Sequence, residues 1–212
     1  MRPEFDCTLY VCTDRKLMSS ASVEESVEAA IRGGATMIQL RDKDVTGREF
    51  YETAVRLKQV TARYHIPLII NDRVDIAMAV DAEGVHLGQK DMPASAARKL
   101  LGEDKIIGVS AAKVEEVKLA LEEGADYLGV GAMYGTSTKT DTRSVSIETL
   151  AQIRQEAEIP IVVIGGIGKD NAMNFRKLGI NGIAVVSSVI AQPDIEAAAA
   201  ELKQIFLGRE AV

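Results

Sequence analysis

The sequence has few of the residues that mark several large classes of protein. It contains no tryptophan and two cysteines, and aromatic residues make up only 4% of its 212 positions. Cys7 and Cys12 are five positions apart, which does not fit a Cys-x-x-Cys pair, and no further cysteine is present to complete a zinc site. We therefore expect two buried free thiols and a reducing, cytoplasmic setting.

Long apolar runs and an excess of positive charge are also absent. No run approaches the ~20 residues of a membrane span, and we expect no signal peptide in Met1-Arg2-Pro3-Glu4. The 25 basic and 31 acidic residues give a net charge of −6. This balance disfavours nucleic acid and a membrane surface as partners. The sequence leaves open whether the chain is a monomer or a homo-oligomer.

Short apolar runs alternate with amphipathic, helix-period segments along the whole chain. The runs do not alternate cleanly between apolar and polar residues, which is typical of parallel strands buried on both faces. The eight runs are Cys7–Thr13, Thr36–Leu40, Pro67–Ile70, Gly84–Leu87, Lys105–Val109, Tyr127–Val130, Ile161–Ile164 and Gly182–Val186. Eight such units predict an α/β fold, a (β/α)8 TIM barrel forming a single catalytic domain over residues 1–212. A doubly wound open sheet is the alternative.

Local signals mark several expected helix ends. Ser22 with Glu25, and Thr46 with Glu49, have the spacing of capping boxes. We expect a further helix to begin near Asp170.

In a barrel, the active face lies where the strands run into their following helices. Gly165-Gly166-Ile167-Gly168 follows the seventh run, and Val186-Ser187-Ser188 closes the eighth. Glycines let backbone N–H groups approach an anion, and these two loops form the usual phosphate site of such barrels. The sequence thus favours a phosphate site over a plain tight turn.

Two acidic residues follow neighbouring strands. Asp72 comes directly after the third run and Asp91 soon after the fourth. Two carboxylates at adjacent strand ends can share Mg²⁺, which keeps its other positions for water and phosphate oxygens. The alternative is a helix cap for Asp72 and a surface turn before Pro93 for Asp91.

Basic residues accompany these acids. Gln39, Arg41 and Lys43 fall on one side if the second strand continues. Lys139 lies in the longest loop, between Gly131 and Val145. Such cations suit a polyphosphate ligand, whereas the alternative is surface ion pairs of Arg41 with Asp42 or Asp44. His86, inside the fourth run, is interpreted as a buried structural histidine, and no paired nucleophile is evident.

Several motifs together resemble the thiamine-phosphate synthase family. The segments that carry the resemblance are Gln39-Leu40-Arg41-x-Lys43, Asn71-Asp72-Arg73-Val74-Asp75-Ile76-Ala77, Gly84-Val85-His86-Leu87-Gly88-Gln89, Asp91-Met92-Pro93, Gly108-Val109-Ser110-Ala111, Gly129-Val130-Gly131, Thr136-x-Thr138-Lys139 and Ile164-Gly165-Gly166-Ile167. They cover the chain from about Leu9 to Ile190. The glycine motifs are unspecific singly, but the combination is specific.

The resemblance implies a reaction and a set of site residues. The enzyme would join 4-amino-2-methyl-5-(diphosphooxymethyl)pyrimidine to 4-methyl-5-(2-phosphooxyethyl)thiazole, giving thiamine phosphate and diphosphate. Diphosphate would leave first, with Arg41, Lys43, Lys139 and Ser110 as the catalytic residues. The residues implied for the pyrimidine diphosphate are Gln39, Leu40, Arg41, Asp42, Lys43, Asn71, Ser110 and Lys139; those for the thiazole phosphate are Thr136, Ser137, Thr138, Gly166, Val186 and Ser187; and those for Mg²⁺ are Asp72 and Asp91.

Two departures and one rival qualify the resemblance. Ala132-Met133-Tyr134-Gly135 stands where the family often has prolines, and Ala112-Lys113 where many members have a polar helix start. The nearest rival is the sister branch of thiazole tautomerase or regulatory proteins, which bind thiazole phosphate without diphosphate chemistry. The presence of Asp72, Asp91, Lys43 and Lys139 favours the synthase.

Overall fold

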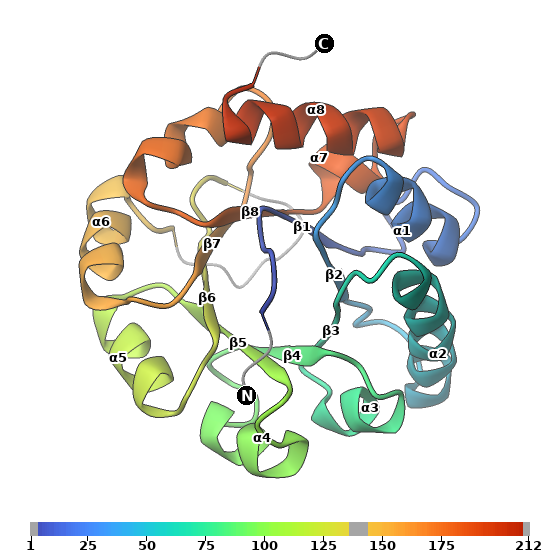
Figure 1. The fold of residues 1–212 in the computed structure, drawn as a ribbon, viewed down its shortest axis with the longest axis horizontal. Coiled ribbons are helices and arrows are strands. Elements are labelled where there is room, and N and C mark those ends of the chain that lie inside the picture. Colours follow the sequence, from blue (N-terminus) through green and yellow to red (C-terminus); the bar gives the residue numbers. More distant parts are fainter. Residues whose placement is uncertain (1–3, 136–143, 210–212) are drawn as a thin grey trace.

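The chain closes on itself as a parallel barrel. The computed structural model describes residues 4–135 and 144–209, and in these ranges eight strands pair in sequence order, with β1 also pairing with β8 (Figure 1). The strands are β1 Leu9–Cys12, β2 Met37–Leu40, β3 Leu68–Asn71, β4 Gly84–Leu87, β5 Ile106–Ala111, β6 Tyr127–Val130, β7 Ile161–Ile164 and β8 Gly182–Val185. The pairing of Leu9 with Ile183 completes the ring, so the (β/α)8 prediction is confirmed and the open sheet is wrong.

Two strands end later in the chain than the sequence pattern indicates. β3 includes Asn71, which pairs with His86, and β5 includes Ser110, which pairs with Gly129. The apolar runs of the sequence stop one residue earlier in each case, at Ile70 and Val109. Both polar residues belong to the strands because their backbones continue the ladder, and this continuation places them at the barrel mouth.

Helices surround the barrel in the ring seen in Figure 1. They are α1 Val23–Arg32, α2 Gly47–Arg63, α3 Val74–Ala79, α4 Ala94–Leu101, α5 Val114–Glu122, α6 Ile147–Glu156, the 3₁₀ helix η1 Ala172–Leu178, α7 Ser187–Ile190 and α8 Ile195–Leu207. The reciprocal capping box of Thr46 and Glu49 is confirmed. At α1 only half of the box forms. The Ser22 side chain accepts from the N–H of Glu25, but the Glu25 carboxylate accepts from the N–H of Ala21 rather than from that of Ser22.

The helix expected near Asp170 is displaced and of another type. It is η1, which begins at Ala172. The side chain of Asn171 accepts a hydrogen bond from Gly168 N–H at 3.0 Å and donates to the Gly166 carbonyl at 2.9 Å. These bonds hold Asn171 in the preceding loop and delay the helix.

Apolar side chains fill two separate regions. One lies between the strands and the helices, and the other lies inside the barrel and contains Tyr10, Met37, Ile69 and Tyr127 among others. Cys7 and Cys12 are buried free thiols, as predicted, and burial raises the pKa of each to about 12. In the part of the chain that is described, no helix combines the length and hydropathy of a membrane span.

The amino-terminal end of the barrel is tied by a repeated hydrogen bond. The residue just before each even-numbered strand accepts, through its side chain, a backbone N–H at the start of the preceding odd-numbered strand. The four acceptors and donors are Thr36 with Leu9 at 3.0 Å, Glu83 with Leu68 at 2.9 Å, Asp126 with Ile107 at 2.8 Å and Asn181 with Ile161 at 2.9 Å. This pattern satisfies strand-end donors that the barrel would otherwise bury without a partner.

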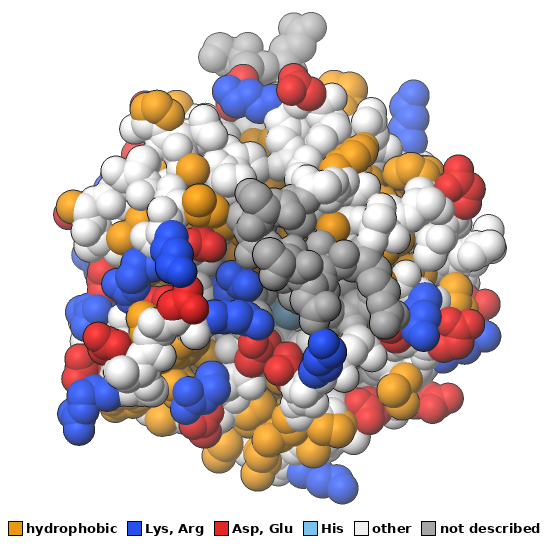
Figure 2. Space-filling view, turned by 180° about the vertical axis from the view of Figure 1, so that it is seen from behind, with side chains coloured by type: hydrophobic (Ala, Val, Ile, Leu, Met, Phe, Trp, Pro, Cys, Tyr) orange, Lys and Arg blue, Asp and Glu red, His pale blue; other side chains and the backbone are white. Residues whose placement is uncertain are grey.

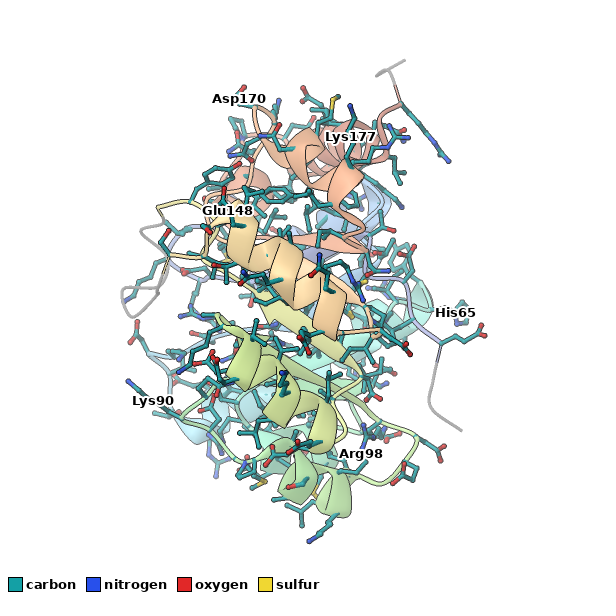
Figure 3. All side chains as sticks on the ribbon, turned by 90° about the vertical axis from the view of Figure 1, so that its left-hand side faces the viewer. His65, Lys90, Arg98, Glu148, Asp170 and Lys177 are labelled. Atoms are coloured by element: carbon teal, nitrogen blue, oxygen red, sulfur yellow. The ribbon has the colours of Figure 1, made fainter. Side chains whose placement is uncertain are left out.

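The third of these acceptors also takes part in a buried ion pair. Arg98 of α4 contacts Asp126 at 2.5 Å, and their side chains are 11% and 4% exposed. The same guanidinium donates to the carbonyls of Lys105 at 2.5 Å and Gly124 at 3.2 Å. Seen from the side, this end of the barrel carries His65, whereas Lys90 lies at the opposite end (Figure 3). The ion pair therefore lies away from the carboxyl ends of the strands, at the end where TIM barrels carry stabilising contacts.

Replacing Arg98 with alanine is expected to lower the free energy of unfolding by about 3–5 kcal/mol, because Asp126 would keep a buried carboxylate without its guanidinium. Urea unfolding monitored by circular dichroism measures the loss. The matched control is Arg48→Ala, since that side chain is 86% exposed and its only described ion pair, with Glu52, is 3.9 Å long. Equal midpoints for the two variants would contradict the prediction.

Candidate active site

The carboxyl ends of the strands bring the predicted acids together. Acidic and basic side chains lie side by side on this face of the molecule (Figure 2). Asp72 follows β3 with a left-handed φ of 64°, and the Oδ2 of Asp91 accepts the N–H of Gly88 at 2.7 Å. The cap proposed as an alternative role for Asp72 is absent, because α3 begins at Val74 after Arg73, with no side-chain cap.

Asp72 lies in an environment that disfavours its negative charge. Burial raises the pKa of its carboxyl, and hydrogen bonding to Asp91 and the charge of Asp91 raise it further. Lys43, 3.4 Å away, partly opposes these effects. Two carboxylates in such contact repel each other unless a proton or a cation lies between them.

The donor set fits a magnesium ion that also binds substrate. Within residues 4–135 and 144–209 no cluster of three or more His, Cys, Asp or Glu side chains could hold a metal. Asp72 and Asp91 therefore offer two carboxylates at most. Mg²⁺ commonly binds through one or two carboxylates and fills its octahedron with water and phosphate oxygens.

Arg41 and Lys43 lie beyond the end of β2, and of the two Lys43 is the one with a described contact to the pair, at Asp72. Arg41 is largely buried, 3.9 Å from Asp14, and its backbone N–H donates to the hydroxyl of Thr13 at 3.0 Å. Lys43 is half exposed. The ion pairs considered for Arg41 with Asp42 or Asp44 are not formed.

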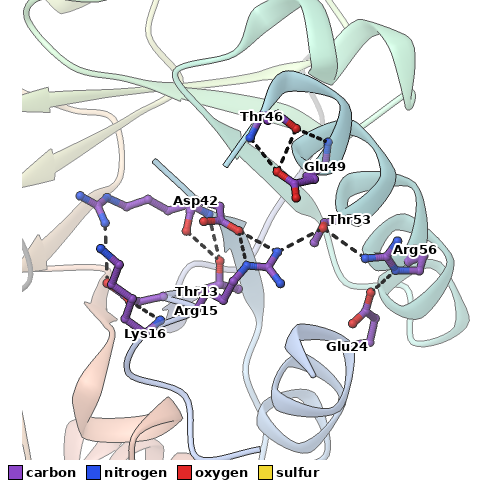
Figure 4. Close-up of polar contacts among 11 residues, drawn as sticks. Thr13, Arg15, Lys16, Glu24, Asp42, Thr46, Glu49, Thr53 and Arg56 are labelled. Carbon is purple, nitrogen blue, oxygen red and sulfur yellow. Dashed lines mark hydrogen bonds and ion pairs between the residues drawn. The ribbon is translucent and has the colours of Figure 1, made fainter. Parts of the chain in front are cut away.

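The neighbouring residues of β2 have other surroundings. Asp42 is bound by Arg15 at 2.8 Å, and Arg15 also contacts Thr53 of α2 at 3.3 Å (Figure 4). Arg15 thus joins the loop after β1 to the loop after β2 and to α2. The side chain of Leu40 is fully buried between strands and helices, so only its backbone can face a ligand.

A continuous chain of hydrogen bonds crosses the barrel interior. Gln39 Nε2 donates to the Tyr10 hydroxyl at 2.6 Å, and this hydroxyl lies 2.9 Å from that of Tyr127. The Tyr127 hydroxyl lies 2.9 Å from His86 Nδ1, and His86 Nε2 lies 2.8 Å from Ser110 Oγ. Two predicted pyrimidine residues, Gln39 and Ser110, are therefore linked through side chains on β1, β6 and β4.

The sequence analysis did not identify Tyr10 and Tyr127, the two tyrosines in this series of hydrogen bonds. Their signal is present, since each is a polar aromatic at an inward position of a strand, but alternation alone does not show which strands face one another. Burial raises the pKa of Tyr10 and of Tyr127 well above the usual tyrosine value, so both hydroxyls keep their protons at neutral pH.

The glycine-rich loop after β7 approaches other backbone closely. Gly165 and Gly166 have φ values of 98° and 63°, and a Cβ at Gly166 would lie 2.8 Å from the carbonyl oxygen of Gly135. The hydroxyl of Ser188 donates to the Ile167 carbonyl, which joins this loop to the segment after β8. Val186 and Ser187 stand at the start of α7 in that segment. The predicted sites at Thr136, Ser137, Thr138 and Lys139 lie outside the described residues.

These features define an enzyme class before any relative is considered. A closed barrel with a glycine loop after β7, and with paired carboxylates and cations after β2 to β4, is typical of a TIM-barrel enzyme acting on phosphorylated substrates.

Comparison with known proteins narrows this class to one family. The family described as thiamine monophosphate synthase matches residues 9–189. The thiamine-phosphate synthase of Clostridium beijerinckii is 56% identical over 207 residues, which cover 98% of this chain and 99% of the relative. That of Ruminiclostridium cellulolyticum is 53% identical over 209 residues, which cover 99% and 100%. The structure of thiamine phosphate pyrophosphorylase from Pyrococcus furiosus superposes with a TM-score of 0.87 at 44% identity, covering 95% of this chain and 96% of that one. The chain belongs to the thiamine monophosphate synthase family.

Replacing Asp72 with asparagine is expected to stabilise the metal-free protein, because it removes a charge that burial and Asp91 disfavour. The thermal midpoint at pH 7 should rise by about 2–4 °C, the shift that about 1 kcal/mol produces in a chain of this size. Added Mg²⁺ should raise the midpoint of the unmodified protein and leave that of the variant nearly unchanged.

Asp81→Asn is the matched control for this experiment. Asp81 also has a left-handed φ, of 52°, but its pKa is lowered by a hydrogen bond to Lys105. Its replacement should not raise the midpoint and should leave the Mg²⁺ response intact. A lower midpoint for Asp72→Asn would show that the carboxylate is stabilising.

Proposed function

We propose that this chain is a thiamine-phosphate synthase that uses Mg²⁺. It joins 4-amino-2-methyl-5-(diphosphooxymethyl)pyrimidine to 4-methyl-5-(2-phosphooxyethyl)thiazole and releases diphosphate. The observation that carries the proposal is the cluster of Asp72, Asp91 and Lys43 at the carboxyl end of the barrel. Family membership supports the same reading.

The diphosphate binds at this cluster. Lys43 and Arg41 face its oxygens, with Lys139 as a third predicted contact, and Asp72 and Asp91 would hold the cation. Mg²⁺, when bound there, neutralises negative charge that builds up on the leaving group. The basic side chains also neutralise this charge. Because their positions are fixed before the reaction, they stabilise the transition state without a cost for reorienting them.

The pyrimidine ring lies over the barrel mouth. Asn71 is the last residue of β3, and Gln39 and Ser110 each lie one residue before the end of their strands. All three are buried or half-buried, so they can bind ring nitrogens and the amino group. The thiazole phosphate binds at the loops after β7 and β8, through Gly166, Val186 and Ser187, with Thr136, Ser137 and Thr138 as predicted contacts. The two substrates then approach one another from opposite sides of the mouth.

The reaction needs no nucleophile or base from the protein. The methylene carbon–oxygen bond breaks and the electron pair leaves with diphosphate. The thiazole nitrogen then donates its lone pair to the methylene carbon. The chain contributes charge stabilisation and the proximity of the two rings, which can account for several kcal/mol of the barrier. The sister activity, thiazole tautomerisation, has no use for the carboxylate and lysine cluster, so that cluster favours the synthase.

Thiamine phosphate formation from the two substrates tests the proposal directly. Product is expected with Mg²⁺ and should be lost with EDTA. Asp91→Asn keeps an oxygen for the Gly88 N–H but removes one charge, so turnover should fall at least about a hundredfold while thiazole phosphate still binds in calorimetry. Thiazole phosphate binding without product in the unmodified protein would move the assignment to the tautomerase branch.

The glycine loop supplies a second prediction. Gly166→Ala is expected to raise the KM for the thiazole phosphate at least about tenfold, a loss of about 1.4 kcal/mol of binding, because the new Cβ would displace the loop from Gly135. Gly102→Ala is the matched control, since Gly102 has a φ of 83° but nothing within 4 Å of its Cβ position. Its variant should show backbone strain in stability and an unchanged KM. Equal KM values for both variants would place the phosphate elsewhere.

A further inference from the structure

The hydrogen-bond chain inside the barrel has a direction. Within the described residues the Tyr10 hydroxyl contacts Gln39 and Tyr127 only. Because the Gln39 amide nitrogen can only donate, Tyr10 accepts there and its single proton goes to Tyr127. The opposite arrangement would bury that proton without an acceptor, which is costly.

The same donor direction continues from Tyr127 to Ser110 at the other end of the hydrogen-bond chain. Tyr127 accepts from Tyr10, so its own proton goes to His86 Nδ1. A neutral imidazole that accepts at Nδ1 carries its proton on Nε2, and this proton goes to Ser110 Oγ. The hydroxyl proton of Ser110 therefore remains available to a ligand at the barrel mouth. The side-chain carbonyl oxygen of Gln39 remains available as an acceptor for the same ligand.

Reversing any one bond requires reversing them all. If the Gln39 amide turned by 180°, its oxygen would accept from Tyr10, and each later donor would become an acceptor. The donor or acceptor character that the site offers at Gln39 is thus coupled to that at Ser110, although the two side chains come from β2 and β5. Such coupling is a property of a connected network rather than of either residue.

We propose that Tyr10, Tyr127 and His86 are positioning residues that make the site select a 4-aminopyrimidine over its 4-oxo counterpart. This inference rests on the proposed function, in which Gln39 and Ser110 hold the pyrimidine. A 4-amino group donates and matches the fixed Gln39 oxygen, whereas a 4-oxo group accepts and meets an acceptor. Buried sites built around one hydrogen-bonding pattern reject the reversed pattern strongly.

The tautomer of His86 tests the direction without any change to the hydrogen-bonded residues themselves. The sequence contains two histidines, His65 and His86, and a His65→Gln variant leaves a single imidazole to assign. Long-range ¹H–¹⁵N spectra at pH 8 should show the His86 proton on Nε2. A proton on Nδ1 would overturn the proposal.

Binding of two unreactive ligands tests the selectivity. The probes are 4-amino-2-methyl-5-(phosphooxymethyl)pyrimidine and its 4-oxo analogue, titrated in a calorimeter with Mg²⁺. The unmodified protein should prefer the amino probe at least about tenfold. In Tyr127→Phe, Gln39 is the one remaining described partner of the Tyr10 proton, so the amide should turn and the preference should disappear or invert.

Two further variants separate positioning from mere structural damage. Tyr10→Phe frees the Gln39 amide and should reduce the preference without inverting it, which keeps the test available if Tyr127→Phe folds poorly. Tyr64→Phe removes a surface hydroxyl bonded to Glu28 and should bind like the unmodified protein. Equal weakening of both probes, or an unchanged preference in both interior variants, would overturn the proposal. Failure of the proposed function would differ, because the unmodified protein would then form no thiamine phosphate.

Discussion

The backbone ladder between β1 and β8 is the constraint on which the rest of the structure depends. Both faces of a parallel sheet have to be covered. Closure gives each strand a neighbour on both sides. It also creates an inner face, packed against other strands, and an outer face, packed against helices. Closure also makes residues far apart in sequence into neighbours across the interior. Tyr10 and Tyr127, separated by 117 positions, share a hydrogen bond only because the sheet has become a barrel.

Polar groups are satisfied at one end of the barrel and held unfavourably at the other. At the amino-terminal end, Thr36, Glu83, Asp126 and Asn181 satisfy strand N–H groups from within the chain. At the carboxyl end, Asp72 sits beside Asp91 in an environment that disfavours its charge. Groups held unfavourably by a rigid frame are typical of sites that bind a charged ligand.

Polar groups inside the barrel connect this frame to the chemistry proposed for it. Gln39 and Ser110 are not independent side chains at the mouth, since two buried tyrosines and His86 join them. The interior therefore does more than fill space. Its hydrogen bonds link Gln39 to Ser110, the two residues proposed to bind the pyrimidine, while Asp72, Asp91 and Lys43, proposed for the metal and diphosphate, lie at the rim.

The sequence by itself determined the eight strands, their parallel arrangement and the placing of polar residues after them, because buried strands, helix caps and glycine loops are local patterns. It also pointed to Asp72 and Asp91 as a pair, since neighbouring strand ends meet in any parallel sheet. Tertiary structure alone decided that Asn71 and Ser110 belong to their strands, that Asn171 delays η1, and that Asp42 binds Arg15 rather than Arg41. It also decided the chain through Tyr10 and Tyr127, because contacts across a closed barrel depend on register and closure, which no local pattern specifies.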